Sequence, residues 1–394
     1  MKFKKEVWLV TELFYPETIS TGYILTEIAK SLTEKNEVNV ISGPKYYELK
    51  QQNLEYESLE NIRIHRVNSN GYNKNILFTR LIGHFIVSLK MLLLMLKKIP
   101  RNSEVLIVTN PALLFLFSSF FIKKKNWKVK LLVHDVFPEN LLVSGVLSSK
   151  SSPLFLLLQY IFNKAFLKME TIIVLGRDMK TIFERKIGFE KRIEIIENWA
   201  DLDNINFNEN KSNNKKFLFA GNLGRVQGIE TLLNVIKKIK SDGFEFLFIG
   251  NGAMGKYVKN YIIDNELINV KKIGWLPRIA QNEFFTKSTI GVISLKEGMY
   301  GLGVPSKLYN LLAAGKPIFY IGDKNSEIHL IMQEHEIGWF AEANNHEMIE
   351  NVFLEIINCD QNILTEYSIN SRKLSENFYS KKIILNKINR LFIS

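Results

Sequence analysis

Short runs of β-forming residues alternate with helical patterns along the chain, and the alternation restarts after one polar stretch. The first series of predicted strands covers residues 7–10, 38–42, 62–67, 105–109, 129–133 and 172–175. The second series covers residues 217–220, 244–249, 270–273, 290–294, 317–321 and 339–341. Because strands separated by helices form parallel sheets, the sequence predicts an α/β fold of two doubly wound, Rossmann-like units that face each other across a cleft.

The boundary between the two units is predicted within residues 204–216, where Asn, Lys, Ser and Glu replace apolar residues. The chain has 394 residues, which exceeds the size at which a single hydrophobic core stops growing. We therefore predict a first domain over residues 1–200, a second domain over residues 201–375 and a C-terminal helix within residues 376–394.

The one cysteine, Cys359, cannot form an internal disulfide or a cysteine metal cluster. A thiol without a partner cysteine favours a reducing compartment, and we expect a cytoplasmic protein. The first apolar run, residues 7–10, is too short for the core of a signal peptide. With 46% hydrophobic and 23% charged residues, the composition excludes a disordered or collagen-like chain.

The net charge of +12 is concentrated in residues 61–130, which contain thirteen basic residues and one acidic residue. Apolar stretches at 81–96, 111–122 and 153–167 lie among or beside these charges. This combination favours contact with an anionic membrane surface over binding of nucleic acid. Because none of the stretches has about 20 uninterrupted apolar residues, we expect the protein to lie on a membrane; the alternative is that these are buried helices of the domain.

A glycine-rich segment, residues 221–228, follows an apolar strand and opens a helix. Gly221 allows close approach of the backbone to a phosphate, and the following helix start favours an anion. The guanidinium of Arg225 would donate paired hydrogen bonds to diphosphate oxygens. Asn222 and Gln227 lie in the same loop. The alternative is a tight turn without a ligand.

Residues 250–255 form a literal G-x-G-x-x-G after the next strand, with Asn251 between the first two glycines. Alone this motif is weak. A dinucleotide site would need an acidic residue at the end of the strand over residues 270–273, and none is present there. A nicotinamide oxidoreductase is therefore disfavoured, and Asn251 is predicted to contact another kind of nucleotide.

The segment from residue 293 to residue 320 combines the largest number of features that indicate a diphosphate site. A glycine-rich loop that contains Glu297 and Gly301 leads to Ser306, a natural helix N-cap, and a short helix that Gly315 ends. Lys307 in the first turn of that helix would hold a diphosphate. Asn310, one turn further, would bond ribose hydroxyls.

In the first half, the loop that ends at Gly22 links a strand to a helix and would bring backbone N–H groups close to the same ligand. His134, Asp135 and Glu139 follow the strand over residues 129–133, where reacting groups of α/β proteins lie. We predict that His134 stabilises charge or relays a proton and that the two carboxylates bind sugar hydroxyls. The alternative is a polar loop cap.

A metal site is not expected. Asp201 and Asp203 resemble an Asp-x-Asp pair, but the neighbouring residues offer no further ligands. The spacing of His329, His335 and His346 fits no zinc motif.

In their order along the chain, these motifs resemble the family 4 glycosyltransferases of the GT-B fold, and in particular the bacterial branch that makes O-antigen, capsule and exopolysaccharide. The resemblance is carried by residues 14–22, 134–139, 196–201, 221–228 and 304–317. It implies a retaining, metal-independent transfer from a nucleotide-sugar without cofactor, with the donor in the second domain and the acceptor in the first. It also implies that the last helix, near residues 381–392, packs back across the cleft.

The expected donor is UDP-linked, with an N-acetylated amino sugar or a deoxy sugar among the candidates. The charge distribution suggests a polyprenyl-diphosphate-linked saccharide as acceptor, at the inner face of the plasma membrane. Many family members carry a glutamate at the position of Asn310 and an Arg/Lys pair near Asn222 and Gln227, whereas these positions are neutral here. Two alternatives stay open: a UDP-sugar 2-epimerase of the same fold and a non-catalytic scaffold on a membrane surface.

Overall fold

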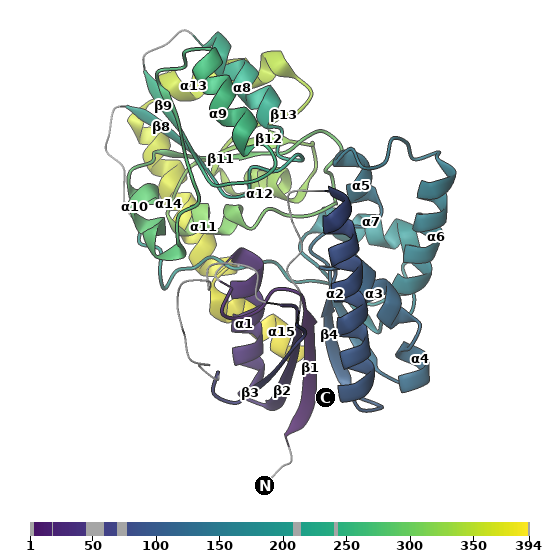
Figure 1. Cartoon of the computed structure of the whole chain (residues 1–394). Coiled ribbons are helices and arrows are strands. Elements are labelled where there is room, and N and C mark those ends of the chain that lie inside the picture. Colours follow the sequence, from purple (N-terminus) through teal and green to yellow (C-terminus); the bar gives the residue numbers. More distant parts are fainter. Residues whose placement is uncertain are drawn as a thin grey trace.

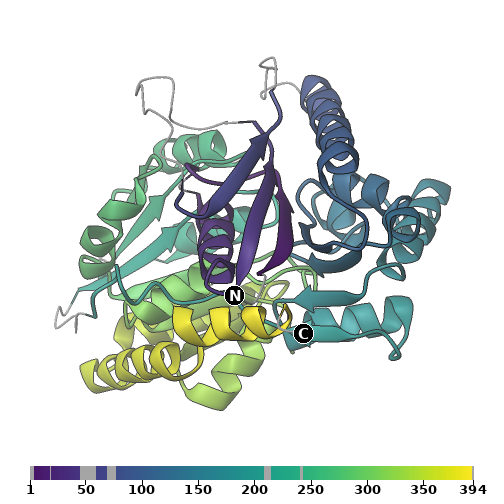
Figure 2. The ribbon, with the colours of Figure 1, turned by 90° about the horizontal axis from the view of Figure 1, so that it is seen from below.

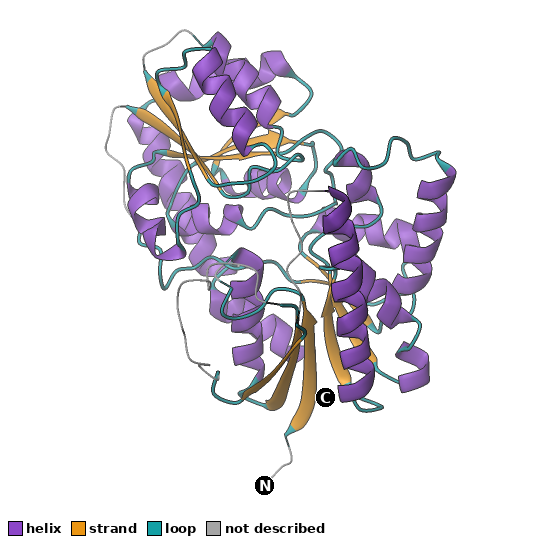
Figure 3. Ribbon diagram, in the orientation of Figure 1, coloured by secondary structure: helices purple, strands orange, loops and turns teal. Residues whose placement is uncertain are grey.

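The computed structural model describes residues 4–17, 19–44, 59–68, 77–207, 214–239 and 243–392. It contains two parallel sheets, of seven and six strands, with helices on both faces (Figures 1 and 3). The strand orders are β3-β2-β1-β4-β5-β6-β7 and β10-β9-β8-β11-β12-β13. In each sheet the order reverses beside the first strand, which is the doubly wound arrangement. The predicted α/β fold is confirmed.

The first sheet consists of β1 (Lys5–Thr11), β2 (Asn36–Ser42), β3 (Ile62–Arg66), β4 (Glu104–Val108), β5 (Lys128–Leu132), β6 (Thr171–Val174) and β7 (Ile193–Ile195). Its helices are α1 (Ser20–Leu32), α2 (Leu77–Lys98), α3 (Ala112–Ser119), α4 (Ile122–Lys125), α5 (Glu139–Val143), α6 (Pro153–Phe166) and α7 (Arg177–Ile187).

The second sheet consists of β8 (Lys215–Ala220), β9 (Phe244–Ile249), β10 (Val270–Ile273), β11 (Ile290–Ser294), β12 (Ile318–Gly322) and β13 (Gly338–Glu342). Its helices are α8 (Ile229–Lys238), α9 (Gly255–Asp264), the 3₁₀ turn η1 (Arg278–Ala280), α10 (Gln281–Thr286), α11 (Lys307–Ala313), α12 (Glu327–His335), α13 (His346–Asn358) and α14 (Gln361–Phe378), and α15 (Lys381–Arg390) follows them.

Each strand predicted from the sequence is present, and two details differ. The three-residue strand β7 is not predicted, because three residues are too few to show an alternation of apolar and polar side chains. Strand β8 begins at Lys215, inside the predicted linker. Lys215 is buried, and its Nζ donates to the carbonyl oxygen of Cys359 at 3.1 Å, so a polar side chain is accommodated at the start of the strand.

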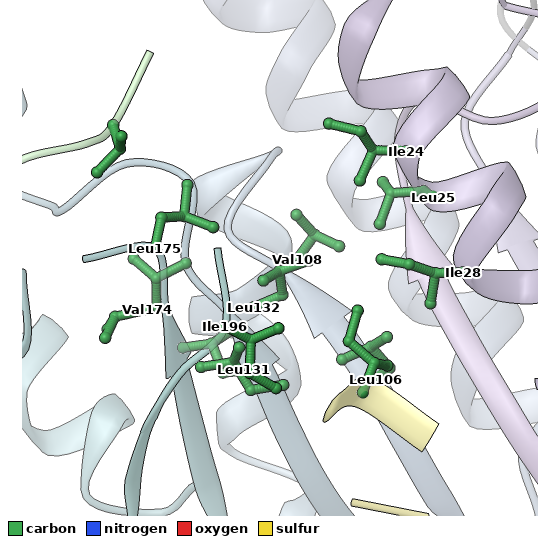
Figure 4. Packing of buried hydrophobic residues seen from close by; sticks show 14 of the residues in the cluster. Ile24, Leu25, Ile28, Leu106, Val108, Leu131, Leu132, Val174, Leu175 and Ile196 are labelled. Carbon is green, nitrogen blue, oxygen red and sulfur yellow. The ribbon is translucent and has the colours of Figure 1, made fainter. Parts of the chain in front are cut away.

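The core of the first unit lies between its sheet and helices on both faces. Figure 4 shows aliphatic side chains of α1, among them Ile24 and Ile28, facing Leu106 of β4 and Leu131 of β5. Burial of one such side chain contributes about 1.5–3 kcal/mol to folding. Because both faces of the strands are covered, β4 is buried at all five positions, as parallel strands require.

Helix α15 packs against α1 of the first unit, although it follows the second unit in sequence (Figures 1 and 2). Lys381 pairs with Glu27 of α1, and Asn389 Nδ2 donates to Ser31 Oγ at 2.8 Å. The chain therefore returns to its first half.

The apolar stretches of the first half form α2, α3 and α6. Helix α3 contacts both α2 and α6. Within the described residues, no helix is both long enough and apolar enough to cross a membrane.

Candidate active site

Lys307 opens α11 and lies against the glycine loop that follows β8. Its Nζ donates to Gln227 Oε1 at 3.0 Å and lies 3.6 Å from the centroid of the Phe219 ring. A Cβ atom at Gly221 would lie 3.6 Å from Lys307 Cε. Burial lowers the pKa of Lys307 to about 7. An anion beside this ammonium would favour its charged form.

The two glycine loops of the second unit are hydrogen-bonded to each other. Gly221 N–H donates to the Ile249 carbonyl, and Leu223 N–H donates to the Asn251 carbonyl, both at 2.9 Å. Gly250 has a positive φ, and a Cβ atom there would lie 1.9 Å from the carbonyl oxygen of Gly221. Only glycine allows this approach, so the G-x-G-x-x-G segment shapes the loop that carries Gly221.

Arg225 and Asn222 are exposed on the same loop. Arg225 has no ion-pair partner among the described residues. The Asn222 side chain lies between the glycine loops, because Cβ atoms at Gly224 and Gly252 would meet it at 3.0 and 2.5 Å. An exposed cation and an amide thus lie on the same loop that Lys307 contacts.

Asn310 lies one turn into α11, and its side chain is partly buried. Asn251 is exposed, and its Oδ1 lies 4.0 Å from a Cβ position at Gly274. The two predicted donor contacts therefore lie on the loop that follows β9 and in the helix α11 that follows β11.

The loop over residues 296–304 is held in place by side chains of other segments of the chain. Asp323 accepts from the Gly298 and Tyr300 amides at 3.0 and 2.6 Å. The Gly301 amide donates to Asp178 of α7 at 3.1 Å, so in this arrangement that N–H group is already used. Glu297 is exposed and accepts from Asn344 at 2.9 Å.

His134 and Asp135 lie where β5 ends. Thr109 Oγ1 accepts the His134 amide at 3.1 Å. Burial lowers the pKa of His134 to about 4 and raises that of Asp135 to about 6. The imidazole is therefore neutral at physiological pH, and its Nε2 is buried without a hydrogen-bond partner among the described residues. Asn140 Nδ2 donates to Asp135 Oδ1 at 2.9 Å.

This segment contacts the loop of the second unit. Val136 N–H donates to the Leu302 carbonyl at 3.1 Å, and a Cβ atom at Gly303 would lie 2.9 Å from the His134 carbonyl oxygen. The strand end of the first unit and the loop before α11 are thereby brought together.

Glu139 opens α5, and its carboxylate pairs with Lys186 of α7. Burial lowers the pKa of Lys186. The pair joins two helices of the first unit, and the second carboxylate oxygen of Glu139, Oε2, is buried without a hydrogen-bond partner among the described residues.

Gly22 lies in the first turn of α1, where a Cβ atom would meet the Glu17 carbonyl oxygen at 2.7 Å. The missing side chain lets the loop fold back on itself. Beside it, Ser20 Oγ donates to Ser306 Oγ at 3.0 Å. The starts of α1 and α11 therefore meet directly.

Three residues that shape the site are absent from the sequence predictions. Asp178 accepts from the Gly301 and Glu327 amides at 3.1 and 3.0 Å, Asp323 holds the loop before α11, and Thr109 holds the His134 segment. Each lies just after a strand, at the carboxyl edge of its sheet or in the first turn of the following helix. That position is the signal that could have identified them.

Asp201 is buried, and Arg278 donates to its Oδ2 at 2.6 and 3.1 Å. Among the described residues, no group of three or more His, Cys, Asp or Glu side chains is arranged to hold a metal ion.

Comparisons with known proteins point to one family. The sequence model of the family described as "Glycosyl transferases group 1" matches residues 201–374. The probable glycosyltransferase WbjE of Pseudomonas aeruginosa is 34% identical over 326 residues, which are 80% of each chain.

Two solved structures share the fold over nearly the whole chain. Sucrose-phosphate synthase from Thermosynechococcus elongatus superposes with a TM-score of 0.76 at 12% identity, over 99% of this chain and 98% of that chain. Anabaena Alr3699/HepE in complex with UDP and glucose superposes with a TM-score of 0.70 at 12% identity, over 98% and 99%. The arrangement of two facing sheets is thus one that these proteins share.

Proposed function

Because this chain belongs to the group 1 glycosyl transferases and has the GT-B fold, we propose that it transfers a sugar, with retention of configuration and without a metal ion, from a UDP-sugar to a lipid-linked saccharide. The domain of residues 201–375 takes the donor, and the domain of residues 1–200 takes the acceptor. The observation that carries the proposal is the contact of Lys307 with Gln227 and Gly221.

The departing UDP carries more negative charge in the transition state than in the bound donor, so groups that bind this charge accelerate transfer. Lys307 donates to Gln227 of the glycine loop without any ligand, and Arg225 is exposed on the same loop. Together they supply the positive charge that a diphosphate requires. Asn310 is proposed to bond the ribose.

On the acceptor side, neutral His134 and the Asp135 carboxylate lie at the end of β5, against the loop that precedes α11. We assign them to the sugar hydroxyls and to the reacting centre. The acceptor hydroxyl attacks on the face from which UDP departs, and contact between the two units excludes water from that face. The basic and apolar surface of the first unit supports an acceptor that is embedded in a membrane, at the cytoplasmic face.

Thermal unfolding in the presence of UDP and GDP tests the donor. A ligand at 100 times its Kd stabilises the folded chain by about 2.7 kcal/mol, so UDP should raise Tm and GDP should not. Lys307→Met and Arg225→Met should each reduce this shift and slow transfer, whereas Lys237→Met on the exposed side of α8 should do neither. Wild-type levels of both in the two site variants would contradict the assignment of the diphosphate.

A further inference from the structure

Helices α7 and α12 begin against each other, although they belong to different units. Within the described residues, neither start is capped by its own N-cap side chain: the N-cap of α7 is Gly176, and Ser326 at the start of α12 makes no capping bond. The hydroxyl of Ser326 instead shares a hydrogen bond of 2.8 Å with Tyr320 Oη. Because the first N–H groups of a helix have no acceptor within the helix, both starts need acceptors from elsewhere.

Each helix receives its acceptor from the other helix. Glu327 Oε2 of α12 accepts from the Arg177 amide in the first turn of α7 at 2.5 Å. In return, Asp178 Oδ2 of α7 accepts from the Glu327 amide in the first turn of α12 at 3.0 Å. The positive ends of two helix dipoles meet here, and the two carboxylates compensate them. We call this reciprocal arrangement the α7–α12 junction.

The junction is tightly packed and dry. A Cβ atom at Gly176 would lie 2.8 Å from both Cβ and Cγ of Glu327, so a side chain there would push α12 away. Asp178 and Glu327 are 3% and 4% exposed. Burial raises the pKa of Asp178, and the N–H groups that donate to its carboxylate offset part of the cost of burying the charge.

Asp178 also holds the loop over residues 296–304. The same Oδ2 atom accepts from the Gly301 amide at 3.1 Å, so one oxygen of the first unit holds two amides of the second. The beginning of this loop is fixed within its own unit by Asp323. Its later part contacts the first unit through Leu302 and Gly303. Asp178 therefore acts where the loop passes from one unit to the other.

We propose that Asp178 is a positioning residue for sugar transfer, which fixes residues 301–303 against the strand end that carries His134. This inference rests on the proposed function. Asp178 acts through the loop and touches neither substrate. The groups proposed for the diphosphate, Lys307 and Arg225, both belong to the second unit. Loss of Asp178 should therefore lower kcat, by moving the donor relative to the acceptor, and should leave the binding of UDP unchanged.

Asp178→Ala and Glu327→Ala separate positioning from stability. Each variant removes one buried carboxylate of the α7–α12 junction and leaves amides without an acceptor, so both should lower Tm. Glu327→Ala leaves the bond between Asp178 and Gly301 in place. Amide hydrogen exchange, measured by mass spectrometry, should therefore be faster over residues 296–304 in Asp178→Ala than in Glu327→Ala. Equal exchange of this loop in the two variants would overturn the proposal.

Steady-state transfer is the second measurement. The donors are UDP-glucose, UDP-galactose and UDP-N-acetylglucosamine, the acceptor is a polyprenyl-diphosphate-linked disaccharide, and all variants are assayed with the donor on which wild type is fastest.

Asp178→Ala should lower kcat about 10- to 100-fold, as a displacement of about 1 Å does, without a change in the KM for the donor. Glu327→Ala, assayed well below its Tm, should keep a kcat close to that of wild type. Asp178→Asn should recover most of the lost kcat, because its amide oxygen can still accept from Gly301. A loss confined to the donor KM, an unchanged kcat in Asp178→Ala, or an equal fall in both alanine variants would overturn the proposal.

Two provisions keep the outcome clear. If Asp178→Ala does not fold, Asp178→Ser replaces it, since the serine hydroxyl ends one bond before the carboxylate oxygens that reach Gly301. Asp178→Ala should keep the wild-type Tm shift with UDP. Absence of both this shift and transfer in wild type would count against the proposed function, whereas the exchange comparison would still decide whether Asp178 holds the loop.

Discussion

We expect Lys307 to couple nucleotide binding to pH. Burial lowers its pKa from the usual 10.5 to about 7, so above pH 7 the unliganded protein holds this lysine mostly neutral. A diphosphate favours the charged form, and binding at pH 8 therefore takes up a proton. UDP itself is fully ionised there, since the second phosphate pKa is about 6.

We predict that the affinity for UDP falls between pH 7 and pH 9, by up to about tenfold per pH unit. Titration calorimetry in buffers of different ionisation enthalpy measures both the affinity and the proton uptake. Lys307→Met should bind UDP more weakly and lose the dependence. An affinity of wild type that is flat from pH 7 to pH 9 would contradict the role of Lys307.

The same lowered pKa affects the stability of the unliganded protein. Between pH 7 and about pH 10 the unfolded chain retains a proton on this lysine that the folded chain has lost. The contribution of Lys307 to stability therefore improves as pH rises through this window. Below pH 7 the folded protein carries a buried charge, which a bound diphosphate would compensate.

At the level of elements, Gly301 connects the loop before α11 with helix α7. This glycine has φ = +67°, and a Cβ atom there would lie 2.5 Å from Ile182 Cγ1 and 2.8 Å from the Asp178 carbonyl oxygen. Gly145 offers a matched control, because its φ is +75° and nothing lies within 4 Å of its Cβ position.

We predict that Gly145→Ala costs about 1 kcal/mol of folding stability through backbone strain alone. Gly301→Ala should cost clearly more and should lower kcat/KM for transfer, because the clash displaces the loop that touches His134 and leads to Lys307. Urea unfolding and steady-state transfer measure the two effects. Equal stability and equal activity of the two variants would argue against a positioning role for this loop.

The sequence predicts helices and strands well where their apolar residues recur at a regular spacing. It does not reveal contacts between residues that are far apart in the chain. The buried strand β4 and the amphipathic helix α8 are evident from the order of apolar residues. The partners of Glu139 and Gly301 are not, because Lys186 and Asp178 are far from them in sequence. The motifs predict ligand contacts for both residues, which stay predictions, and the structure shows a protein partner for each.

At the scale of the whole molecule, the two sheets are joined by polar contacts on more than one side. Arg177 of α7 pairs with Glu327 and Glu334 of α12 at 3.1 and 2.5 Å. Elsewhere, Arg278 of η1 stacks on the ring of Tyr23 of α1, with its Cζ atom 3.6 Å from the ring centroid. These contacts join segments of both units, and they stabilise the relative position of the two halves of the site.

The ion pair between Arg278 and Asp201, which lies beside the stacking contact with Tyr23, is expected to control the stability of the entire chain. Arg278→Met leaves the buried Asp201 carboxylate, which is 1% exposed, without its cation, and such a loss costs about 3–5 kcal/mol. Adding Asp201→Asn removes the uncompensated charge, so the double variant should recover part of that stability. Lys287→Met breaks an exposed pair with Glu283 and should leave the stability nearly unchanged, because water screens such a pair. Urea unfolding compares the three. A single variant at Arg278 that unfolds like the Lys287 variant would refute this prediction, because the hydrogen bonds that Tyr23 Oη and Asn204 Nδ2 donate to Asp201 Oδ1 would then be enough to hold the carboxylate without its cation.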